Sequence, residues 1–308
     1  MYQRPLGYLL GLEGAALLRA FIGDHDPAFT EQRIAEIRRL LRTPGLDVAG
    51  VEATRVTTLE GYAVWSASYD DPGNGLFAID EPLVRRLLGP LPPGLALDAA
   101  CGTGRLSAAL AAMGHRVVGV DSSSDMLTRA RLRLPQARFL EGDLHRLPLG
   151  DASVDIVVCA LALTHLPDLR APVAELARVV RPGGHVLIVD VHHELLSLGS
   201  VPRIRRPDGQ PGMLPGYRHR ASDYLDAALP VGLEVRRCVE PGKESRGDGE
   251  TPTDEADVAA DRSEPDVGAD PGPWDAWPWS LMGIVPAAAE AVWKGTPSLM
   301  VWLFQRRP

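Results

Sequence analysis

The stretch that decides the fold is LALDAACGTGRLSAAL, residues 95–110. A short apolar run delivers Asp98, the turn Cys101-Gly102-Thr103-Gly104 follows, and the pattern predicts a helix beginning near Arg105. Two glycines let the backbone approach a ligand closely, and the N-terminus of a helix favours negative charge. The sequence therefore predicts a strand–turn–helix unit at a ligand site, although a Gly-x-Gly turn alone also occurs in dinucleotide enzymes.

The same alternation of apolar runs and amphipathic stretches continues on the C-terminal side. The predicted strands are 95–100, 115–121, 137–143, 154–163, 184–192, 233–240 and 298–306. The helices expected between the first five of them are 104–114, 123–134 and 169–184. Near-continuous apolar strands separated by helices indicate a mostly parallel sheet covered on both faces. We therefore expect an α/β fold with a doubly wound, seven-stranded, Rossmann-like sheet.

The N-terminal part of the chain has a different character. Helical spacing of Ile34, Ile37 and Leu40 predicts a helix within 27–42, and the turn-rich DDPGNG closes the region at residue 75. We expect residues 1–75 to form a helical lid and residues 76–308 to form the main domain.

The net charge of −8 is concentrated in one segment. Between Glu240 and Asp270 there are eleven acidic and three basic residues, so the rest of the chain is close to neutral. The segment 241–273 has few large apolar residues, which predicts a flexible acidic insert. A neutral body with an acidic tract offers no basic footprint for a phosphate backbone, so nucleic acid is not expected as a partner.

The sequence has no membrane-spanning run, no clear leader pattern and no cysteine motif for metal, which bears on where the protein is located and on whether it binds metal. No apolar run reaches the roughly 18–20 residues that span a membrane, so no membrane partner is expected, and the first residues lack a clear basic n-region. Three cysteines without a CxxC pair are typical of reduced thiols, which predicts a cytoplasmic protein without a zinc–cysteine site. The triplet His192-His193-Glu194 is not expected to bind metal either, because neighbouring residues on a strand point oppositely.

Asp98 and Asp121 distinguish between two kinds of ligand, a dinucleotide and a nucleoside with an amino acid tail. Asp121 ends the second strand of the sheet, where a carboxylate can accept hydrogen bonds from ribose hydroxyls. A dinucleotide fingerprint needs a third glycine where Ser107 stands, and Asp98 would repel a pyrophosphate. A negative charge there suits the ammonium group of a methionine moiety. The ligand implied is a nucleoside with an amino acid tail.

These motifs resemble those of the class I S-adenosylmethionine-dependent methyltransferases, in particular the bacterial small-molecule type. DAACGTGRLSAAL resembles the first motif of the family, with Ala100 in place of its first glycine, and VVGVDSSSDMLTRAR resembles the second. FLEGDLHRLPLGDASVDIVVCALALTHLPD resembles the third and fourth, and Pro182-Gly183-Gly184 resembles the turn before the fifth strand. The resemblance runs from about residue 65 to residue 192 and resumes more faintly at 217–240 and 279–306.

The resemblance implies S-adenosylmethionine as cofactor and assigns residues to its parts. Gly102 and Gly104 approach the methionine portion, Asp98 contacts the amine, and Asp121, followed by Ser122, holds the ribose. Asp143 and Leu144 flank the adenine. The remaining cofactor residues implied are Tyr69, Ala100, Met126, Ala160 and Leu161. A simpler role in a turn or in the core stays open for Asp98, Met126, Asp143 and Leu144, and Tyr69 could be an ordinary exposed tyrosine before a helix.

The expected reaction is methyl transfer to a small molecule, with oxygen as the first choice of acceptor atom. A hydroxyl acceptor needs help to lose its proton, and His165 and His192 follow predicted strands at the edge of the sheet where ligands bind. A structural role remains the alternative for both histidines. Three other functions stay open: a protein that binds S-adenosylmethionine without transferring its methyl group, a nicotinamide-dependent oxidoreductase, and a methyltransferase of protein or nucleic acid. The sequence does not determine the oligomeric state.

Overall fold

The computed structural model describes residues 1–71, 75–242 and 271–308. These residues group into two units. The smaller unit comprises residues 1–55, 205–212 and 271–296, and the larger comprises 56–71, 75–204, 213–242 and 297–308. The division along the chain thus falls after residue 55, and residues 56–71 belong to the larger unit. Of the insert expected at 241–273, residues 243–270 lie outside the described residues.

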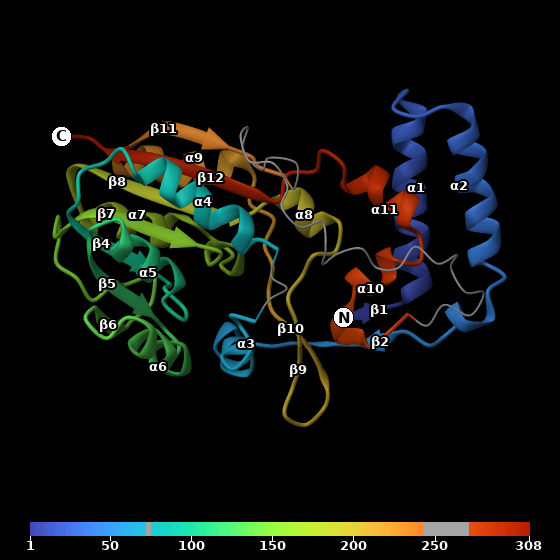
Figure 1. The fold of residues 1–308 in the computed structure, drawn as a ribbon, viewed down its shortest axis with the longest axis horizontal. Helices are drawn as coiled ribbons and strands as arrows, with labels where there is room; N and C mark the ends of the chain where they lie inside the picture. Colours follow the sequence, from blue (N-terminus) through green and yellow to red (C-terminus); the bar gives the residue numbers. More distant parts are fainter. Residues whose placement is uncertain (72–74, 243–270) are drawn as a thin grey trace. The chain divides into compact units, whose positions relative to one another are not determined.

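The larger unit is built on the seven-stranded sheet that the sequence predicts (Figure 1). The strand order is β11-β12-β8-β7-β4-β5-β6, and β12 runs antiparallel to both β8 and β11 while the other pairs are parallel. The strands are β4 (Leu95–Ala99), β5 (Arg116–Asp121), β6 (Arg138–Glu141), β7 (Val154–Ala160), β8 (Val180–Val191), β11 (Leu233–Val239) and β12 (Leu299–Arg306). The prediction of a doubly wound, mostly parallel sheet is confirmed.

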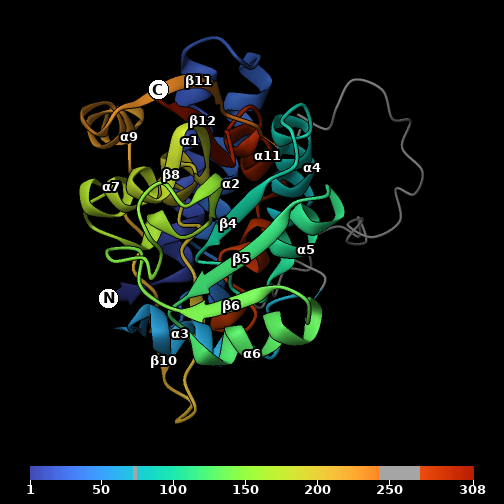
Figure 2. The same ribbon diagram turned by 90° about the vertical axis from the view of Figure 1, so that its left-hand side faces the viewer.

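Alternating side chains of this sheet feed two separate cores, one on each face. Along β8, for example, Val186 and Ile188 join one core, whereas Leu187 and Val189 join the other. The first core also takes residues of α7 and α9, and the second takes residues of α4, α5 and α6. The helices are α4 (Phe77–Leu88), α5 (Arg105–Ala112), α6 (Ser124–Arg133), α7 (Arg170–Val179) and α9 (Ala221–Ala228). Figure 2 shows α7 and α9 on one side of the sheet and α4 and α5 on the other. Helices therefore cover both faces, because the central strands β4, β7 and β8 are apolar on both sides.

The larger unit also contains shorter elements, most of which lie at or near the carboxyl ends of the parallel strands, whereas the last one precedes β11. They are α3 (Thr58–Trp65), the 3-10 turn η2 (Leu163–His165), α8 (His193–Ser197) and the 3-10 turn η3 (Leu229–Val231). Of these, η2 follows β7 and α8 follows β8 directly. No helix of the described ranges is long and apolar enough to cross a membrane.

The smaller unit is mainly helical. Its helices and 3-10 turns are α1 (Pro5–Phe21), α2 (Pro27–Leu40), η1 (Pro44–Leu46), η4 (Trp274–Ala276), α10 (Trp279–Met282) and α11 (Pro286–Trp293). The helix α1 packs against α2, α10 and α11, and a buried ion pair joins Glu13 to Arg33, with Oε1 and Nη1 at 3.1 Å. Burial raises the pKa of Glu13 to about 7. The helix predicted within 27–42 is confirmed as α2.

Two small sheets complete the described structure. β1 (Tyr2–Gln3) pairs with β2 (Val51–Glu52) in the smaller unit. The other sheet has the order β3-β10-β9 and contains residues at which the chain passes from one unit to the other. Its strands are β3 (Thr54–Arg55), β9 (Arg203–Arg205) and β10 (Pro211–Met213).

Candidate cofactor and acceptor site

A cavity that is partly open to solvent lies at the carboxyl edge of the sheet in the larger unit. It sits over β4, where the chain order of the sheet reverses, since β5 lies on one side of β4 and β7 on the other. Ligands of doubly wound folds bind at this switch point. The residues lining the cavity are Thr58, Leu59, Tyr62, Tyr69, Ala100, Gly102, Val120, Asp121, Ser122, Ser123, Gly142, Asp143, Leu144, Ala160, Leu161, Ala162, His165 and Leu166.

The glycine turn places backbone, not side chains, against this cavity. Gly102 has φ +52° and a Cβ added to it would meet no atom within 4 Å, so its open side leaves room for a ligand. Gly104 has φ +77° and begins α5, and a Cβ there would lie 3.1 Å from Ala130. Gly102 therefore lines the cavity, whereas Gly104 is needed where the helix packs closely on α6. Ala100 also has a positive φ, +60°, which explains why glycine is the usual residue at this position of the motif.

Asp121 organises the turn and faces the cavity at the same time. Its Oδ2 accepts a hydrogen bond from the Gly102 N–H at 2.8 Å, and its Oδ1 accepts one from the Ser123 N–H at 2.8 Å. Burial raises the pKa of this carboxyl, and the hydrogen bonds from the backbone act against the increase. Each carboxylate oxygen has two lone pairs, so Asp121 can still accept bonds from a ligand. The tip of β5 is thus a preformed acceptor site beside the glycine turn.

Asp98 lies behind the turn and does not line the cavity. Its side chain is 1% exposed, and its Oδ2 accepts a hydrogen bond of 2.7 Å from the Ser107 hydroxyl. Burial raises the pKa of Asp98 to about 6. Ser107 stands where a dinucleotide fingerprint has its third glycine, and here its side chain binds the acid that precedes the turn. Contact of Asp98 with a methionine amine stays a prediction.

At the other end of the turn region, Asp143 and Leu144 follow β6 and line the cavity. The Oδ1 of Asp143 accepts a 2.7 Å hydrogen bond from the backbone N–H of His145 and lies 2.6 Å from its ring Nδ1. Partial burial acts to raise the pKa of Asp143, but these hydrogen bonds hold it below its usual value. Asp143 therefore carries its charge at neutral pH at the edge of the site.

The tip of β7 forms the wall between the two ends of the cavity. Ala160, Leu161 and Ala162 line it, and Leu161 has φ +55° while its N–H donates to the carbonyl of Val189 at 2.7 Å. A leucine in the left-handed region costs about 1–2 kcal/mol. This strain turns the chain sharply from β7 into η2, which brings His165 back over the cavity.

The helix α3 supplies residues that the sequence analysis did not assign to the site. It begins at a capping box, in which the Thr57 hydroxyl accepts from the Glu60 N–H and the Glu60 carboxylate accepts from the Thr57 N–H. Gly61 fits closely on Leu214, since an added Cβ would lie 2.5 Å from that side chain. This packing directs Tyr62 into the cavity. The capping box gives a sequence signal for the start of the helix, but no local pattern marks Tyr62 as a cavity residue.

Tyr69 is held over the glycine turn by its neighbours. Asp70 accepts a 2.8 Å hydrogen bond from the Thr103 hydroxyl and a 2.7 Å bond from Arg133. The Tyr69 ring packs against Phe77 with centroids 5.4 Å apart and against Tyr62 at 5.9 Å. The segment with Tyr62 and Tyr69 is therefore anchored to the same turn that lines the cofactor end.

His165 and Tyr62 form a hydrogen-bonded pair inside the cavity. The Tyr62 Oη lies 2.9 Å from His165 Nε2, and His165 Nδ1 lies 2.6 Å from the carbonyl oxygen of Pro215. A carbonyl only accepts, so Nδ1 carries the imidazole proton and Nε2 accepts from the Tyr62 hydroxyl. Burial lowers the pKa of His165 and raises the pKa of Tyr62 well above its usual value. Both groups are neutral at pH 7.

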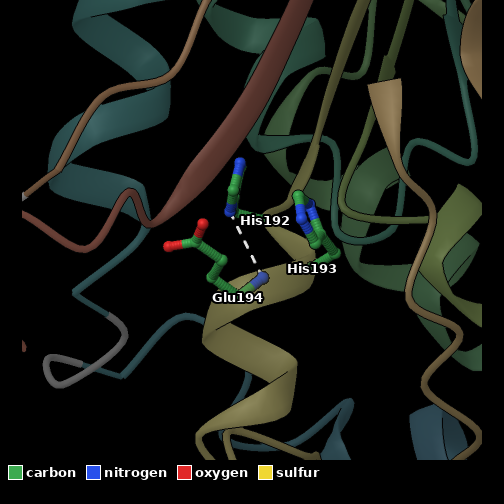
Figure 3. A group of neighbouring side chains, drawn as sticks. All are labelled: His192, His193 and Glu194. Atoms are coloured by element: carbon green, nitrogen blue, oxygen red, sulfur yellow. Dashed lines mark hydrogen bonds between the residues drawn. The ribbon is translucent and has the colours of Figure 1, made fainter. Parts of the chain in front are cut away.

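His192, the second candidate base, does not line the cavity. It is 2% exposed and caps α8, and its Nδ1 accepts from the backbone N–H of Glu194 at 3.3 Å. Its Nε2 lies 3.7 Å from Oε1 of Glu240. Figure 3 shows the His193 ring and the Glu194 carboxylate on opposite sides of the start of α8, although their ligand atoms and that of His192 lie within 4.8 Å of one another. Because the cap already uses the Nδ1 lone pair of His192, the geometry favours a structural role.

The structure thus brings together most of the residues that the sequence singled out. Those that line the cavity are Tyr69, Ala100, Gly102, Asp121, Ser122, Asp143, Leu144, Ala160, Leu161 and His165. Those that do not are Asp98, Gly104, Met126 and His192. Met126 is 1% exposed within α6. The residues that sequence reasoning missed are Thr58, Leu59, Tyr62, Val120, Ser123, Gly142, Ala162 and Leu166.

Comparison with known proteins agrees with this geometry. Residues 97–188 match the family model of a methyltransferase domain. The chain is 40% identical over 159 residues to the malonyl-[acyl-carrier protein] O-methyltransferase of Yersinia pestis, an alignment that covers 51% of this chain and 55% of that protein. It is 39% identical over 103 residues to the demethylmenaquinone methyltransferase of Beutenbergia cavernae, covering 33% of this chain and 43% of that protein. The chain therefore spans about half the length of these curated relatives.

A solved structure has the same fold. The DhpI–SAH complex superimposes with a TM-score of 0.52 at 20% identity, covering 81% of this chain and 95% of that one. Residues 97–188 thus carry a methyltransferase domain, and the sheet topology and the glycine turn are those of the class I S-adenosylmethionine-dependent type.

Proposed function

We propose that the protein transfers a methyl group from S-adenosylmethionine to an oxygen atom of a small-molecule acceptor and releases S-adenosylhomocysteine. The observation that carries this proposal is the single cavity shared by two sets of groups. At one end are Gly102, Asp121 and Asp143, which suit a nucleoside with an amino acid tail. At the other are Tyr62 and His165, which suit an acceptor that must lose a proton.

The residues present fit the cofactor. The open side of Gly102 leaves space for the amino acid portion, and Asp121 offers carboxylate oxygens for ribose hydroxyls. Leu144 and Val120 provide apolar surface for adenine. Bound S-adenosylmethionine would supply an electrophilic methyl group on a sulfonium. The work left to the chain is to align the acceptor oxygen with that methyl group and to receive the proton.

The cytoplasm is the proposed compartment, supported by three free cysteines of which Cys101 and Cys159 are buried. The proposed lid over the acceptor pocket is supported most directly by α3, which lines the cavity with Thr58, Leu59 and Tyr62. The alternative function, binding of S-adenosylmethionine without transfer, shares the cofactor end and differs only at the acceptor end.

Calorimetric titration with S-adenosylhomocysteine tests the proposal, with NADH titrated in parallel and Asp121→Ala as the variant. We expect micromolar binding of S-adenosylhomocysteine, no binding of NADH, and an affinity at least 100-fold lower in Asp121→Ala. A folded protein that binds neither compound, or only NADH, would contradict the proposal. Binding of S-adenosylhomocysteine without consumption of S-adenosylmethionine in the presence of any small hydroxyl compound favours the non-transferring alternative.

A further inference from the structure

The acceptor end of the cavity contains a polar pair, of which His165 is buried and Tyr62 is partly buried. Tyr62 and His165 are joined by a hydrogen bond of 2.9 Å, and the apolar residues Leu59, Ala162 and Leu166 line the same cavity. A buried hydroxyl–imidazole pair is costly to keep unless its partners are fixed. Here the Pro215 carbonyl fixes the imidazole and the packing of α3 fixes the phenol.

We propose that Tyr62 and His165 act as a two-residue proton relay, and that the acceptor is a neutral phenol- or enol-type hydroxyl compound. This inference rests on the proposed function and deepens it. Tyr62 contacts the acceptor oxygen, and His165 acts through Tyr62, because the Nε2 lone pair that would serve as base is already taken by the Tyr62 hydroxyl.

The charge of the cavity restricts the acceptor. Among the described residues that line it there is no lysine or arginine, while two carboxylates, Asp121 and Asp143, are present. An anionic acceptor such as a carboxylate or phosphate ester would find no cationic side chain among these residues, and the sulfonium of the bound cofactor would be its only positive partner. A neutral hydroxyl compound with an apolar body fits the leucine and alanine walls.

The strength of the base restricts the acceptor further. The imidazole is neutral and its pKa is lowered by burial, so it is a weak base. Proton transfer is efficient when donor and acceptor are matched. A phenol or enol, with a pKa near 10 as for tyrosine, can be deprotonated as the new bond forms, whereas an alkyl alcohol is far too weak an acid.

The step balances as follows. The acceptor oxygen forms a bond to the methyl carbon while the carbon–sulfur bond breaks and leaves its electron pair on sulfur. The acceptor proton moves to Tyr62 Oη as the phenolic proton of Tyr62 moves to His165 Nε2. The imidazolium then donates back through Tyr62 to solvent once the products leave. The other titratable groups facing this pair are Tyr69, Asp121 and Asp190, and His219 donates to the carbonyl of Leu166 beside it.

Two measurements test the relay. The first is nitrogen NMR of histidine-labelled protein saturated with S-adenosylhomocysteine. We expect His165 in the Nδ1–H tautomer from pH 8 to below its ordinary pKa, with a hydrogen-bonded Nε2 whose resonance shifts towards that of a free acceptor in Tyr62→Phe. His165→Gln identifies the signal. A cationic His165 at neutral pH, the opposite tautomer, or no response to Tyr62→Phe would overturn the pairing.

The second measurement is transfer of labelled methyl groups to catechol, 2-naphthol and 4-nitrophenol, beside benzoate, phenyl phosphate and benzyl alcohol. We expect methyl ethers of the phenols only. Tyr62→Phe and His165→Gln should each lower kcat about 100-fold, as for loss of a general base, and the double variant no further, because the two residues act as a unit. Affinity for S-adenosylhomocysteine should stay within threefold in both, which also shows that they are folded. His185→Gln, within β8 and outside the cavity lining, is the matched control.

The outcomes separate this inference from the proposed function. Loss of S-adenosylhomocysteine binding in the wild type would refute both. Binding without transfer to any phenol, or transfer to benzoate, phenyl phosphate or benzyl alcohol, would overturn the acceptor class alone. Phenol transfer at an undiminished rate in Tyr62→Phe would overturn the relay.

Discussion

The two ends of the cavity are built in different ways. The cofactor end comes from one nearly continuous stretch, from β4 through the glycine turn to β5 and the residues after β6, and much of its ligand-facing surface is backbone. The acceptor end is assembled from segments far apart in the sequence: Tyr62 from α3, His165 from η2, and the carbonyl of Pro215. The first end is therefore defined by local turn geometry, and the second by tertiary packing.

Each end also rests on a buried aspartate that lies outside the cavity. Asp98, at the end of β4, binds Ser107 beneath the glycine turn. Asp190, at the end of β8, accepts from the Tyr224 hydroxyl at 2.9 Å and from the backbone N–H groups of Val191 and Thr164 beneath η2. Burial raises the pKa of both, to about 6 for Asp98 and about 7 for Asp190. The turn at each end is thus supported by a buried carboxyl group whose pKa lies above its ordinary value.

The largest expected effect on ligand affinity distinguishes Asp121 from Asp143, the two acids of the cofactor end. Asp121→Asn should weaken binding of S-adenosylhomocysteine about 100-fold, roughly 2.7 kcal/mol, because its amide nitrogen would face the N–H of Gly102 or Ser123 and the turn would open. Asp143→Asn should weaken it only about fivefold, since the Asp143 side chain is 65% exposed. Calorimetry compares the two. Equal losses in both variants would show that the ligand charge, not the turn, sets the affinity.

The next effect concerns the two glycines of the turn. Gly104→Ala should lower the free energy of unfolding by about 2 kcal/mol, because φ is +77° and the new Cβ would lie 3.1 Å from Ala130. Gly102→Ala should cost only about 1 kcal/mol, from backbone strain alone, since no atom lies within 4 Å, yet it should reduce cofactor affinity more. Urea unfolding measures the loss of stability in both variants, and calorimetry measures the loss of affinity for S-adenosylhomocysteine. If Gly104→Ala is the variant that loses affinity, the assignment of the two roles is wrong.

These two ends were not equally predictable from the sequence. A strand, a glycine turn and an acid at the next strand tip leave a local pattern, so Gly102, Asp121 and all seven strands could be predicted. Tyr62 and Leu166 reach the cavity only through packing of α3 and the sharp turn at Leu161, which no local spacing encodes. For His192 the local pattern suggested a place in the site, because the residue follows a strand. In the structure its Nδ1 caps α8 instead.

A pH effect on the free energy of unfolding, and not on affinity, distinguishes the acid under the acceptor end. The folded pKa of Asp190 is about 7, above the ordinary unfolded value near 3.9. Its contribution is therefore fully present below about pH 4 and is lost as pH rises towards 7, by up to about 1.4 kcal/mol per pH unit. Asp190→Asn does not titrate, so the stability of the wild type relative to this variant should fall between pH 5 and 7 and level off above. Urea unfolding at several pH values measures it. A difference that is constant with pH would show that Asp190 is charged in the folded protein throughout.

The smallest effect tests whether the two ends are energetically separate. Leu166 lines the acceptor end and Leu144 the cofactor end, and both are partly buried leucines packed against the same core. Leu144→Ala should weaken S-adenosylhomocysteine binding about tenfold, because its apolar surface is expected to cover the adenine. Leu166→Ala removes the same atoms at the other end and should change that affinity by less than about twofold, while it alters which phenols are methylated. Because both variants replace a leucine by alanine, any difference between their affinities for S-adenosylhomocysteine reflects where the residue lies and not which atoms are removed. A tenfold loss in Leu166→Ala as well would mean that closure of the acceptor wall contributes to holding the cofactor, and the cavity would then have to be treated as one cooperative site.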